Sequence, residues 1–520
     1  MTKWLENAIF YEIYPQSFYD TNGDGIGDLQ GIIKKLDYIK ELGCNALWIN
    51  PCFESPFNDA GYDVSDYMKI APRYGTNEDM RELLSEAHKR GIHVLLDLVP
   101  GHTSIEHKWF KESMKSDDNE YSQRYIWSGC PWERFEGVSH VIGGINGICE
   151  RGTAAVNFFS TQPALNYGFS NPDPDKHWQL PVDAPEVVAT REAMLDVMRF
   201  WLSMGCDGFR VDMAHSLIKN DEGCVETIKL WKKFRAVLDE EFPEAVLISE
   251  WGEPDKSIPA GFHMDFLLHF GPSHYNNLFR EKPFFSGKNQ GDLHKFLAYF
   301  KDIRAKSGDS GLICIPSGNH DMSRIAHKLT PHELKLAFLF LLTMPGCPFI
   351  YYGDEIGMRY LEDIPLVEGG YERTGSRTPM QWDTTLNAGF SSAPGNMLYN
   401  LLDPDKDRPT VSEQISNPDS VLNEVKKLTK LRHETDVLRS MSPIEFLTDG
   451  KPGEALVYTR GNKELVYIAI NPSLNAVKVP MLEGKKVLYT IGEGLINEKN
   501  AKRFSDANLR LALQSAVICK

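Results

Sequence analysis

Three acidic residues, Asp212, Glu250 and Asp321, each stand at or just after the end of a short apolar run. Taken singly, an acid in such a place is more often a helix cap or an ion-pair partner. When carboxylates are crowded, however, like charges and burial separate their pKa values, so that one stays protonated while another is ionised. Glycosidic bond cleavage requires that division, because an acid protonates the leaving oxygen while an anion captures the oxocarbenium-like carbon. The three acids indicate this chemistry if the fold brings them together.

Arg210 precedes Asp212 by two residues in the run Gly-Phe-Arg-Val-Asp. Side chains two residues apart on a strand point to the same face, so the guanidinium is expected to lie beside the carboxylate and keep it ionised. We therefore expect Asp212 to be the nucleophile, with a second acid supplying the proton.

Eight short β-branched or aromatic runs alternate with amphipathic helical stretches, such as 29–42 and 77–90. Right-handed crossovers bury every strand of such a chain on both sides, so eight strand–helix units predict an α/β fold with a closed parallel (β/α)8 barrel, the TIM barrel. Its chemistry sits at the carboxyl ends of the strands, which brings the three acids to one mouth. The expected strands are Ile9–Tyr14, Ala46–Asn50, His93–Val99, Gly208–Asp212, Val246–Glu250, Met264–Leu268, Leu312–Pro316 and Pro348–Tyr351.

Two parts of the chain fall outside the barrel pattern. The stretch between the third strand and the next helix is too long for an ordinary βα loop, which predicts an inserted subdomain at 102–185. After the last helix the hydrophobic pattern changes to period two, which predicts a C-terminal antiparallel β-sandwich domain at 441–520. The barrel is then expected to comprise 1–101 and 186–440.

Composition excludes several classes of partner. The formal net charge is −16 over 520 residues, so a phosphate backbone would be repelled and nucleic acid is not an expected partner. The longest apolar run, 337–352, is interrupted by Pro and Gly and is too short for a bilayer span, so no membrane association is expected. The nine cysteines contain no CxxC pair and are expected to be buried thiols. With no visible secretory signal, a cytoplasmic location is the expectation.

The motifs also match a known family. The chain resembles the α-amylase superfamily of retaining glycoside hydrolases and transglycosylases, and the likeness spans nearly its whole length. The motifs that carry it, in order, are GYDVSDY (61–67), DLVPGH (97–102), QPALN (162–166), GFRVD (208–212), ISE (248–250), NHD (319–321) and GCPFIYYGDEIG (346–357).

The resemblance assigns roles to individual residues. It makes Asp212 the nucleophile, Glu250 the general acid/base and Asp321 the stabiliser of the transition state that binds sugar hydroxyls. It also places Tyr62 against the face of the sugar in subsite −1, the site of the glucose that is transferred. The residues implied to line that subsite with Tyr62 are His102, Arg210 and His320.

Further motifs indicate a branch of the superfamily. SRTPMQWD (376–383), NAGFS (387–391) and QPALN resemble the branch of α-glucosidases, oligo-1,6-glucosidases and trehalose synthases. Asp59 and Arg373 match a pair that, in these enzymes, binds the outer hydroxyls of a terminal glucose and closes the site beyond −1. Alternatively, Arg373 is a surface arginine in a polar loop.

The segment DTNGDGIGD (20–28) has the pattern of a calcium loop. Oxygen ligands stand at alternate positions, with Gly at position six, and the α-glucosidase branch carries the same loop with a bound, structural Ca²⁺. A metal-free turn is the alternative, because the bidentate Glu of an EF-hand is absent. Gly101 replaces an Asn that binds a second calcium in many amylases, so no calcium is expected beside the active site. The expected ligands are Asp20, Asn22, Asp24, the carbonyl of Ile26 and Asp28.

The leading expectation is an exo-acting retaining α-glucosidase that takes terminal α-linked glucose from short oligosaccharides or disaccharides by double displacement. The alternative is a transglycosylase or isomerase, trehalose synthase-like or oligosaccharide-forming, that passes the same glucosyl group to a sugar. A non-catalytic relative is disfavoured, because the chain keeps all three acids. The expected partner is a small α-glucoside, bound by a monomer or homodimer. The linkage preference stays open.

Overall fold

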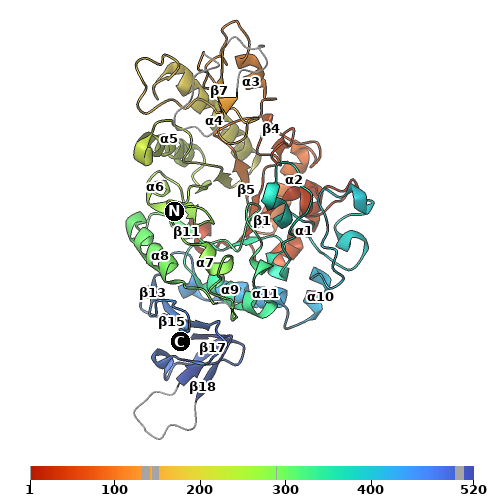
Figure 1. The fold of residues 1–520 in the computed structure, drawn as a ribbon, viewed down its shortest axis with the longest axis vertical. Helices are drawn as coiled ribbons and strands as arrows, with labels where there is room; N and C mark the ends of the chain where they lie inside the picture. Colours follow the sequence, from red (N-terminus) through yellow and green to blue (C-terminus); the bar gives the residue numbers. More distant parts are fainter. Residues whose placement is uncertain (1, 130–140, 143–150, 289, 498–508) are drawn as a thin grey trace.

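The computed structural model describes residues 2–129, 141–142, 151–288, 290–497 and 509–520. Its centre is an eight-stranded parallel sheet with the strand order β11-β10-β9-β8-β5-β2-β1-β12. A parallel bridge between Pro316 and Phe349 joins the two outer strands, so the sheet closes into a barrel. The predicted (β/α)8 barrel is therefore confirmed (Figure 1).

All eight predicted strands are present, each shorter than predicted by one or two residues. The segments that follow β8 and β9 leave the sheet at Asp212 and Glu250, which frees these acids from the ladder. The strands are β1 (Phe10–Ile13), β2 (Ala46–Ile49), β5 (His93–Leu98), β8 (Gly208–Val211), β9 (Val246–Ser249), β10 (Met264–Phe266), β11 (Leu312–Cys314) and β12 (Phe349–Tyr351).

Helices follow the strands and begin where side chains cap their first turns. Asp28 accepts a hydrogen bond from the backbone of Gly31 at the start of α1, and Thr76 and Asp79 form a capping box at α2. The longer helices are α1 (Leu29–Glu41), α2 (Asn77–Lys89), α4 (Pro185–Met204), α5 (Val225–Glu241), α8 (His294–Ser307), α9 (Pro331–Thr343) and α11 (Val421–Glu434). The shorter ones are α3 (Lys108–Ser113), α6 (Pro254–Ser257), α7 (Asn276–Phe279) and α10 (Val411–Ser416).

The connection between β5 and α4 carries α3 and a two-stranded sheet of β6 (Val141–Ile142) and β7 (Ala154–Ala155). Figure 1 shows α3 and β7 beyond one end of the barrel, on the side away from the C-terminal sheet. A second two-stranded sheet, β3 (Phe53–Glu54) with β4 (Asp66–Ile70), follows β2. The boundaries 102–185 for a separate subdomain stay a prediction.

The C-terminal part is antiparallel, as its period-two pattern predicts. Tyr458 and Arg460 of β14 attach it to the barrel through Thr343 at the end of α9: the two hydroxyls lie 2.5 Å apart, and the guanidinium donates to the Thr343 carbonyl. One sheet has the order β13 (Ile444–Phe446), β14 (Leu456–Gly461), β15 (Leu465–Asn471), β20 (Ser515–Cys519), β17 (Val487–Ile491). The other has the order β16 (Val477–Lys478), β19 (Leu509–Leu511), β18 (Leu495–Asn497).

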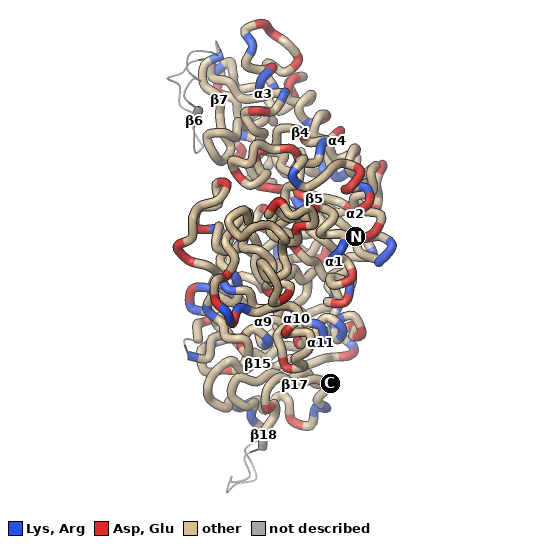
Figure 2. Tube along the Cα trace, turned by 90° about the vertical axis from the view of Figure 1, so that its right-hand side faces the viewer, with Lys and Arg blue, Asp and Glu red and all other residues tan. Residues whose placement is uncertain are grey.

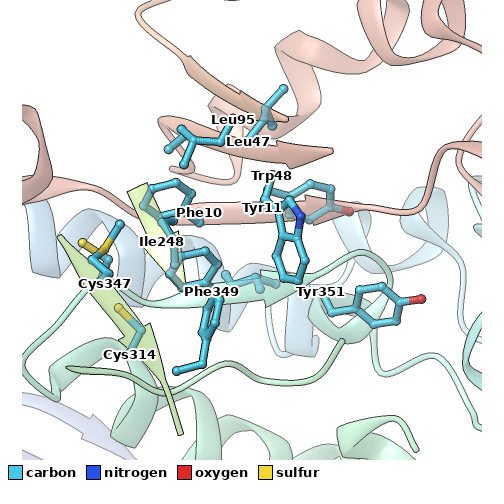
Figure 3. Packing of buried hydrophobic residues seen from close by; sticks show 14 of the residues in the cluster. Phe10, Tyr11, Leu47, Trp48, Leu95, Ile248, Cys314, Cys347, Phe349 and Tyr351 are labelled. Carbon is cyan, nitrogen blue, oxygen red and sulfur yellow. The ribbon is translucent and has the colours of Figure 1, made fainter. Parts of the chain in front are cut away.

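The barrel interior is filled by side chains. Phe10 and Phe349 stack with ring centroids 4.3 Å apart (Figure 3). Phe266 packs edge-on against Phe349, with centroids 4.8 Å apart. Because the barrel has no central channel, a ligand has to bind at its mouth. Charged residues of both signs are scattered along the whole trace (Figure 2). Within the described residues, no helix has the length and apolar character needed to cross a lipid bilayer.

Glu355, which follows β12, is a buried acid whose ionised form lowers the free energy of unfolding. Its Oε1 atom accepts hydrogen bonds from the hydroxyls of Tyr11 and Tyr38, each at 2.7 Å, and burial raises its pKa to about 7. Because this pKa lies above its ordinary value, the protonated form favours folding. The stabilisation that the protonated Glu355 gives to the fold is fully present below the ordinary pKa, and it is lost as the pH rises through 7.

We therefore expect Glu355→Gln to raise the free energy of unfolding at pH 8 by roughly 3 kcal/mol and to change it little at pH 5. The amide keeps the acceptor for both tyrosines and removes the buried charge. Urea unfolding at the two pH values measures the effect. An equal effect at both would contradict the assignment.

Candidate active site

Asp212 and Glu250 follow neighbouring strands of the barrel and share one cation. The Arg210 guanidinium lies 3.2 Å from the Asp212 carboxylate, 2.8 Å from that of Glu250 and 2.9 Å from that of Asp97. Arg210 is fully buried and lies over the ring of Trp48, with its central carbon 5.0 Å from the centroid. The backbone N–H of Met213 donates to Oε2 of Glu250 at 3.0 Å. Both acids are thus held in fixed positions.

One guanidinium shared by three carboxylates does not keep Asp212 ionised. Burial and the negative charge of Glu250 raise the pKa of Asp212 well above its usual value, and the opposing effect of Arg210 is smaller. The expectation that Arg210 would hold Asp212 ionised is therefore wrong. Two buried carboxylates side by side disfavour carrying two negative charges at once.

Asp321 has a different environment. Its Oδ1 atom lies 2.9 Å from Arg373 and 3.0 Å from Arg377, and its Oδ2 atom lies 3.3 Å from Nε2 of His320. Burial raises the pKa of Asp321, but the contact with His320 and the positive charges of the two arginines outweigh burial. The pKa therefore falls below its usual range. Asp321 is therefore an ionised acceptor for hydroxyl groups.

Tyr62 and His320 form a stacked pair against the base of the site. Their rings are nearly parallel, with centroids 5.4 Å apart, and the Tyr62 hydroxyl lies 2.7 Å from Nε2 of His320 and 3.0 Å from Asp97. Nδ1 of His320 lies 2.9 Å from the buried carboxylate of Glu12. Burial lowers the pKa of His320 well below its usual value, so the ring is neutral. These contacts fix the orientation of Tyr62.

His102 completes the wall beside Tyr62. Its Nε2 atom lies 3.1 Å from the carbonyl of Tyr62, and its Nδ1 atom lies 3.3 Å from the side-chain amide of Asn157. Burial lowers the pKa of His102 to about 4, so the imidazole is neutral, with Nε2 as donor and Nδ1 as acceptor. The Tyr62 carbonyl and Asn157, which lies 55 residues further along the same β5–α4 connection, together set the tautomer of His102.

Asp59 and Arg373 meet at one end of the site. The Arg373 guanidinium bridges Asp59, at 3.4 Å, and Asp321, at 2.9 Å. The second carboxylate oxygen of Asp59 accepts a hydrogen bond from Gln162 at 2.8 Å. Burial raises the pKa of Asp59 to about 7. Arg373 is only one-fifth exposed, which disfavours the alternative of a free surface arginine.

These side chains surround a cavity of about 420 Å³, a volume typical of small-molecule sites. Seven of the nine residues predicted from the sequence line it, while Arg210 and His320 lie behind its wall. The lining residues are Asp59, Tyr62, His102, Asp212, Glu250, Asp321 and Arg373, together with Phe158, Phe159, Met213, His215, His269, Phe270 and Tyr371.

Sequence reasoning missed several of the supporting residues. Asp97 lies in the motif at 97–102 and Arg377 in the motif at 376–383, so the family motifs could have identified both residues. Neither of them was assigned a role from the sequence. Glu12 stands in the apolar run of β1, where a lone acid is itself a signal of a buried polar contact. The aromatic residues of the mouth, Phe158 and Tyr371, had no signal because they come from irregular segments far apart in the sequence.

The loop at 20–28 is closed by its own hydrogen bonds. Asp20 accepts bonds from the backbone of Asn22, Gly23 and Gly25, and Asp24 accepts one from the backbone of Ile26. Among the described residues, no three acidic, His or Cys side chains lie close enough together to hold an ion. The calcium site therefore stays a prediction.

Six of the seven described cysteines are buried and all seven are free, as expected for structural thiols. Cys130 and Cys149 lie outside the described residues.

Comparison with known proteins agrees with this geometry. Residues 12–441 match the family model of the α-amylase catalytic domain. The chain is 33% identical over 497 residues to the trehalose synthase/amylase TreS of Mycolicibacterium smegmatis, covering 84% of this chain and 77% of that protein. It is 32% identical to the oligo-1,6-glucosidase of Heyndrickxia coagulans, covering 92% and 93% of the two chains.

Solved structures give the same result. The crystal structure of a trehalulose synthase variant in complex with Tris superposes with a TM-score of 0.80 at 26% identity, covering 99% of this chain and all of that one. The trehalose-6-phosphate hydrolase of Bacillus licheniformis gives a TM-score of 0.78 at 27% identity, with 99% of both chains covered. With a matching family model over most of its length, a matching barrel and acids at the expected strand ends, the chain belongs to the α-amylase family of glycoside hydrolases.

Proposed function

We propose that the protein is an exo-acting retaining α-glucosidase that removes terminal α-linked glucose from disaccharides or short oligosaccharides. The observation that supports this best is the pair of carboxylates held by one buried cation: Arg210 contacts both Asp212 and Glu250, and both acids line the cavity. The relatives named as oligo-1,6-glucosidases and as a glucan 1,6-alpha-glucosidase add support.

In the first step, Asp212 attacks the anomeric carbon while Glu250 donates a proton to the leaving oxygen. The product is a β-linked glucosyl-enzyme and a released sugar. In the second step, Glu250 removes a proton from water, which attacks the same carbon and displaces Asp212. Two inversions return the α configuration. As the substrate reacts, positive charge develops at its anomeric carbon beside Asp212. This charge favours the ionised form of the Asp212 carboxylate.

The surrounding groups orient the glucose. Asp321, ionised by its two arginines, accepts hydrogen bonds from sugar hydroxyls, and the Tyr62 ring packs against the sugar face. Neutral His102 presents a fixed tautomer to the same sugar. The Met213 backbone N–H donates a hydrogen bond to Oε2 of Glu250, while Oε1 of Glu250 contacts Arg210. The two contacts together fix the plane of the carboxyl group.

The Asp59–Arg373 pair gives the exo mode. We expect Asp59→Asn to raise KM for a disaccharide by about 10- to 100-fold, because one charge-assisted hydrogen bond to a sugar hydroxyl is lost and Arg373 loses its partner. kcat is expected to change less. Glu372→Gln, beside Arg373 but exposed, is the matched control. Steady-state kinetics on maltose and isomaltose measures the effect, and an unchanged KM would refute the assignment.

A transglycosylase or isomerase is the second candidate. The outer part of the cavity is apolar, with Phe158, Phe270 and Tyr371 at its rim, and an apolar site holds a sugar acceptor better than water. Relatives named as trehalose synthase and trehalulose synthase add support.

Product analysis separates the two candidates. The purified protein is incubated separately with maltose, isomaltose, sucrose, trehalose and maltotriose, and proton NMR follows the identity and anomeric form of each product. Release of α-glucose from one or two of these substrates supports the hydrolase and identifies its bond. If new disaccharides or oligosaccharides exceed free glucose at high maltose concentration, the hydrolase is rejected in favour of the transglycosylase or isomerase.

We also propose that the loop at 20–28 binds Ca²⁺ in a structural role. The residue types suit Ca²⁺: Asp20, Asp24 and Asp28 each carry a carboxylate whose partners, in the described part of the chain, are N–H and O–H groups, with no Lys or Arg among them. The three carboxylates do not converge in this structure, so binding would require the loop to draw them together. Asn22 and the carbonyl of Ile26 would supply the remaining protein oxygens.

Calcium at one hundred times its Kd is therefore expected to stabilise the fold by about 2.7 kcal/mol and raise the thermal midpoint, with EDTA reversing the effect. Asp24→Asn is expected to weaken this response, and Asp66→Asn, an exposed acid elsewhere, serves as the control. Differential scanning fluorimetry reports the midpoints. Identical midpoints with Ca²⁺ and EDTA would reject the site.

A further inference from the structure

Two cysteines face each other where the barrel closes. Pro316 and Phe349 are parallel bridge partners, so counting back two residues on each segment places Cys314 opposite Cys347 on the same face. Both residues are at least 99% buried, and a hydrogen bond joins their thiols. Figure 3 shows the two side chains on neighbouring segments beside the stacked Phe10 and Phe349. This pair, Cys314 and Cys347, is called the closure dithiol below.

Cys347 has polar neighbours on more than one side, and its thiol donates a hydrogen bond to the Leu5 carbonyl at 3.3 Å. Its Sγ atom lies 3.6 Å from the Ser440 hydroxyl, and Arg432 is held nearby by the carbonyls of Leu342, Met344 and Gly346. Within the described residues, Arg432 has no carboxylate partner, so a thiolate is the anion available to it.

The pKa values distinguish Cys347 from the other thiols. Burial raises the pKa of Cys347, but the hydrogen bonds from Cys314 and Ser440 and the charge of Arg432 outweigh it, so the pKa is lowered. Burial raises the pKa of the other six described cysteines, which are Cys44, Cys52, Cys206, Cys224, Cys314 and Cys519. Because the two thiols face each other across the barrel closure, Cys347 could serve as the attacking cysteine and Cys314 as its resolving partner.

A small cavity lies beside this pair. It has a volume of about 30 Å³ and is lined by Ile313 and Gly346, the chain neighbours of the two cysteines, and by Ser440, which contacts Cys347. Arg304 lines the same cavity. A space of this size admits one molecule about as large as water. Hydrogen peroxide, with two oxygen atoms, is the peroxide nearest to that size, whereas alkyl hydroperoxides and glutathione disulfide are much larger.

We propose that the closure dithiol is a peroxide-oxidised site that forms a Cys314–Cys347 disulfide. The Cys347 thiolate attacks one peroxide oxygen, the O–O bond breaks, and the departing hydroxide takes a proton to leave as water, which gives Cys347 sulfenic acid. The Cys314 sulfur then attacks the Cys347 sulfur, the S–O bond breaks, and the hydroxide leaves as water with the Cys314 proton. Two thiols lose two electrons, and one peroxide becomes two waters.

The test maps cysteine oxidation in the folded, full-length protein. The protein is treated with a few equivalents of hydrogen peroxide, free thiols are alkylated, and the digest is analysed by mass spectrometry. We expect a cross-linked peptide containing Cys314 and Cys347, formed at least ten times faster than oxidation of Cys52 or Cys206. tert-Butyl hydroperoxide is expected to form it at least ten times more slowly than hydrogen peroxide.

Variants separate the two roles. Cys314→Ser is expected to leave a sulfenic acid on Cys347 that dimedone traps, and Cys347→Ser is expected to leave Cys314 as unreactive as Cys206. Cys206→Ser is the matched control and is expected to form the cross-link at the wild-type rate. The proposal is wrong if wild-type protein gives no cross-linked peptide, or if Cys52 and Cys206 oxidise as fast. The wild-type map decides even if a variant does not fold.

Discussion

Asp212→Asn is expected to lower kcat by roughly 10⁴-fold while leaving the fold intact. The amide is nearly isosteric with the carboxylate and keeps an oxygen for Arg210, whose other partners, Asp97 and Glu250, are unchanged. It does not, however, provide the anion that captures the anomeric carbon. The measurement is kcat on the best disaccharide, with thermal unfolding and circular dichroism as checks on the fold.

Chemical rescue makes this prediction specific. If Asp212 is the nucleophile, Asp212→Gly with added azide should produce β-glucosyl azide, because the small anion attacks from the face that the carboxylate occupied. Asp265→Asn is not a suitable control, since Asp265 is bonded to the backbone of Trp251 and Gly252. Asp255→Asn, at a half-buried position near the site in sequence, should keep wild-type activity. Activity above one-tenth of wild type in Asp212→Asn would disprove the assignment.

Glu250→Ala is expected to have the second-largest effect, and its size should depend on the leaving group. We expect a loss of about 10³- to 10⁴-fold on disaccharides, whose leaving oxygen needs a proton. For p-nitrophenyl or fluoride leaving groups, formation of the glucosyl-enzyme is expected to be nearly unchanged, because these groups depart without protonation. Pre-steady-state release of p-nitrophenol measures that step directly.

Azide again identifies the role. With the glucosyl-enzyme formed and Glu250 absent, azide attacks the intermediate and should give α-glucosyl azide, the opposite anomer to that expected from Asp212→Gly. Glu253→Gln, a half-buried acid three residues later that pairs with Lys256, is the matched control. A β-glucosyl azide from Glu250→Ala, or equal losses on all leaving groups, would exclude Glu250 as the acid/base.

The strands and the acids at their ends were predictable because both depend on local pattern. A run such as Ala46–Ile49 is apolar on both faces, which marks a strand buried on both sides, and the polar residue that follows it marks the mouth of the barrel. The ends of the strands were less predictable. The backbone N–H groups of Asp212 and Glu250 still donate hydrogen bonds to neighbouring strands, but both residues lie one position beyond the end of their own strands.

The ionisation of Asp212 was not predictable from its neighbour in sequence. Arg210 is two residues away, as the pattern required, but its charge is divided among three carboxylates. The pKa therefore depends on Asp97 and Glu250, which lie 115 and 38 residues from Asp212 along the chain, and on burial that only the assembled barrel creates.

The sequence by itself determined the parallel barrel, the order of its strands along the chain, the family and the three acids, because hydrophobic periodicity and short motifs are local properties. The tertiary structure alone decided which groups act on those acids. The apolar mouth formed by Phe158 and Tyr371 and the Glu12 carboxylate behind His320 each join segments hundreds of residues apart, and the thiol pair where the barrel closes joins two strands separated by a helix. Their proximity arises from closure of the barrel and from its long β5–α4 connection, and no local pattern records it.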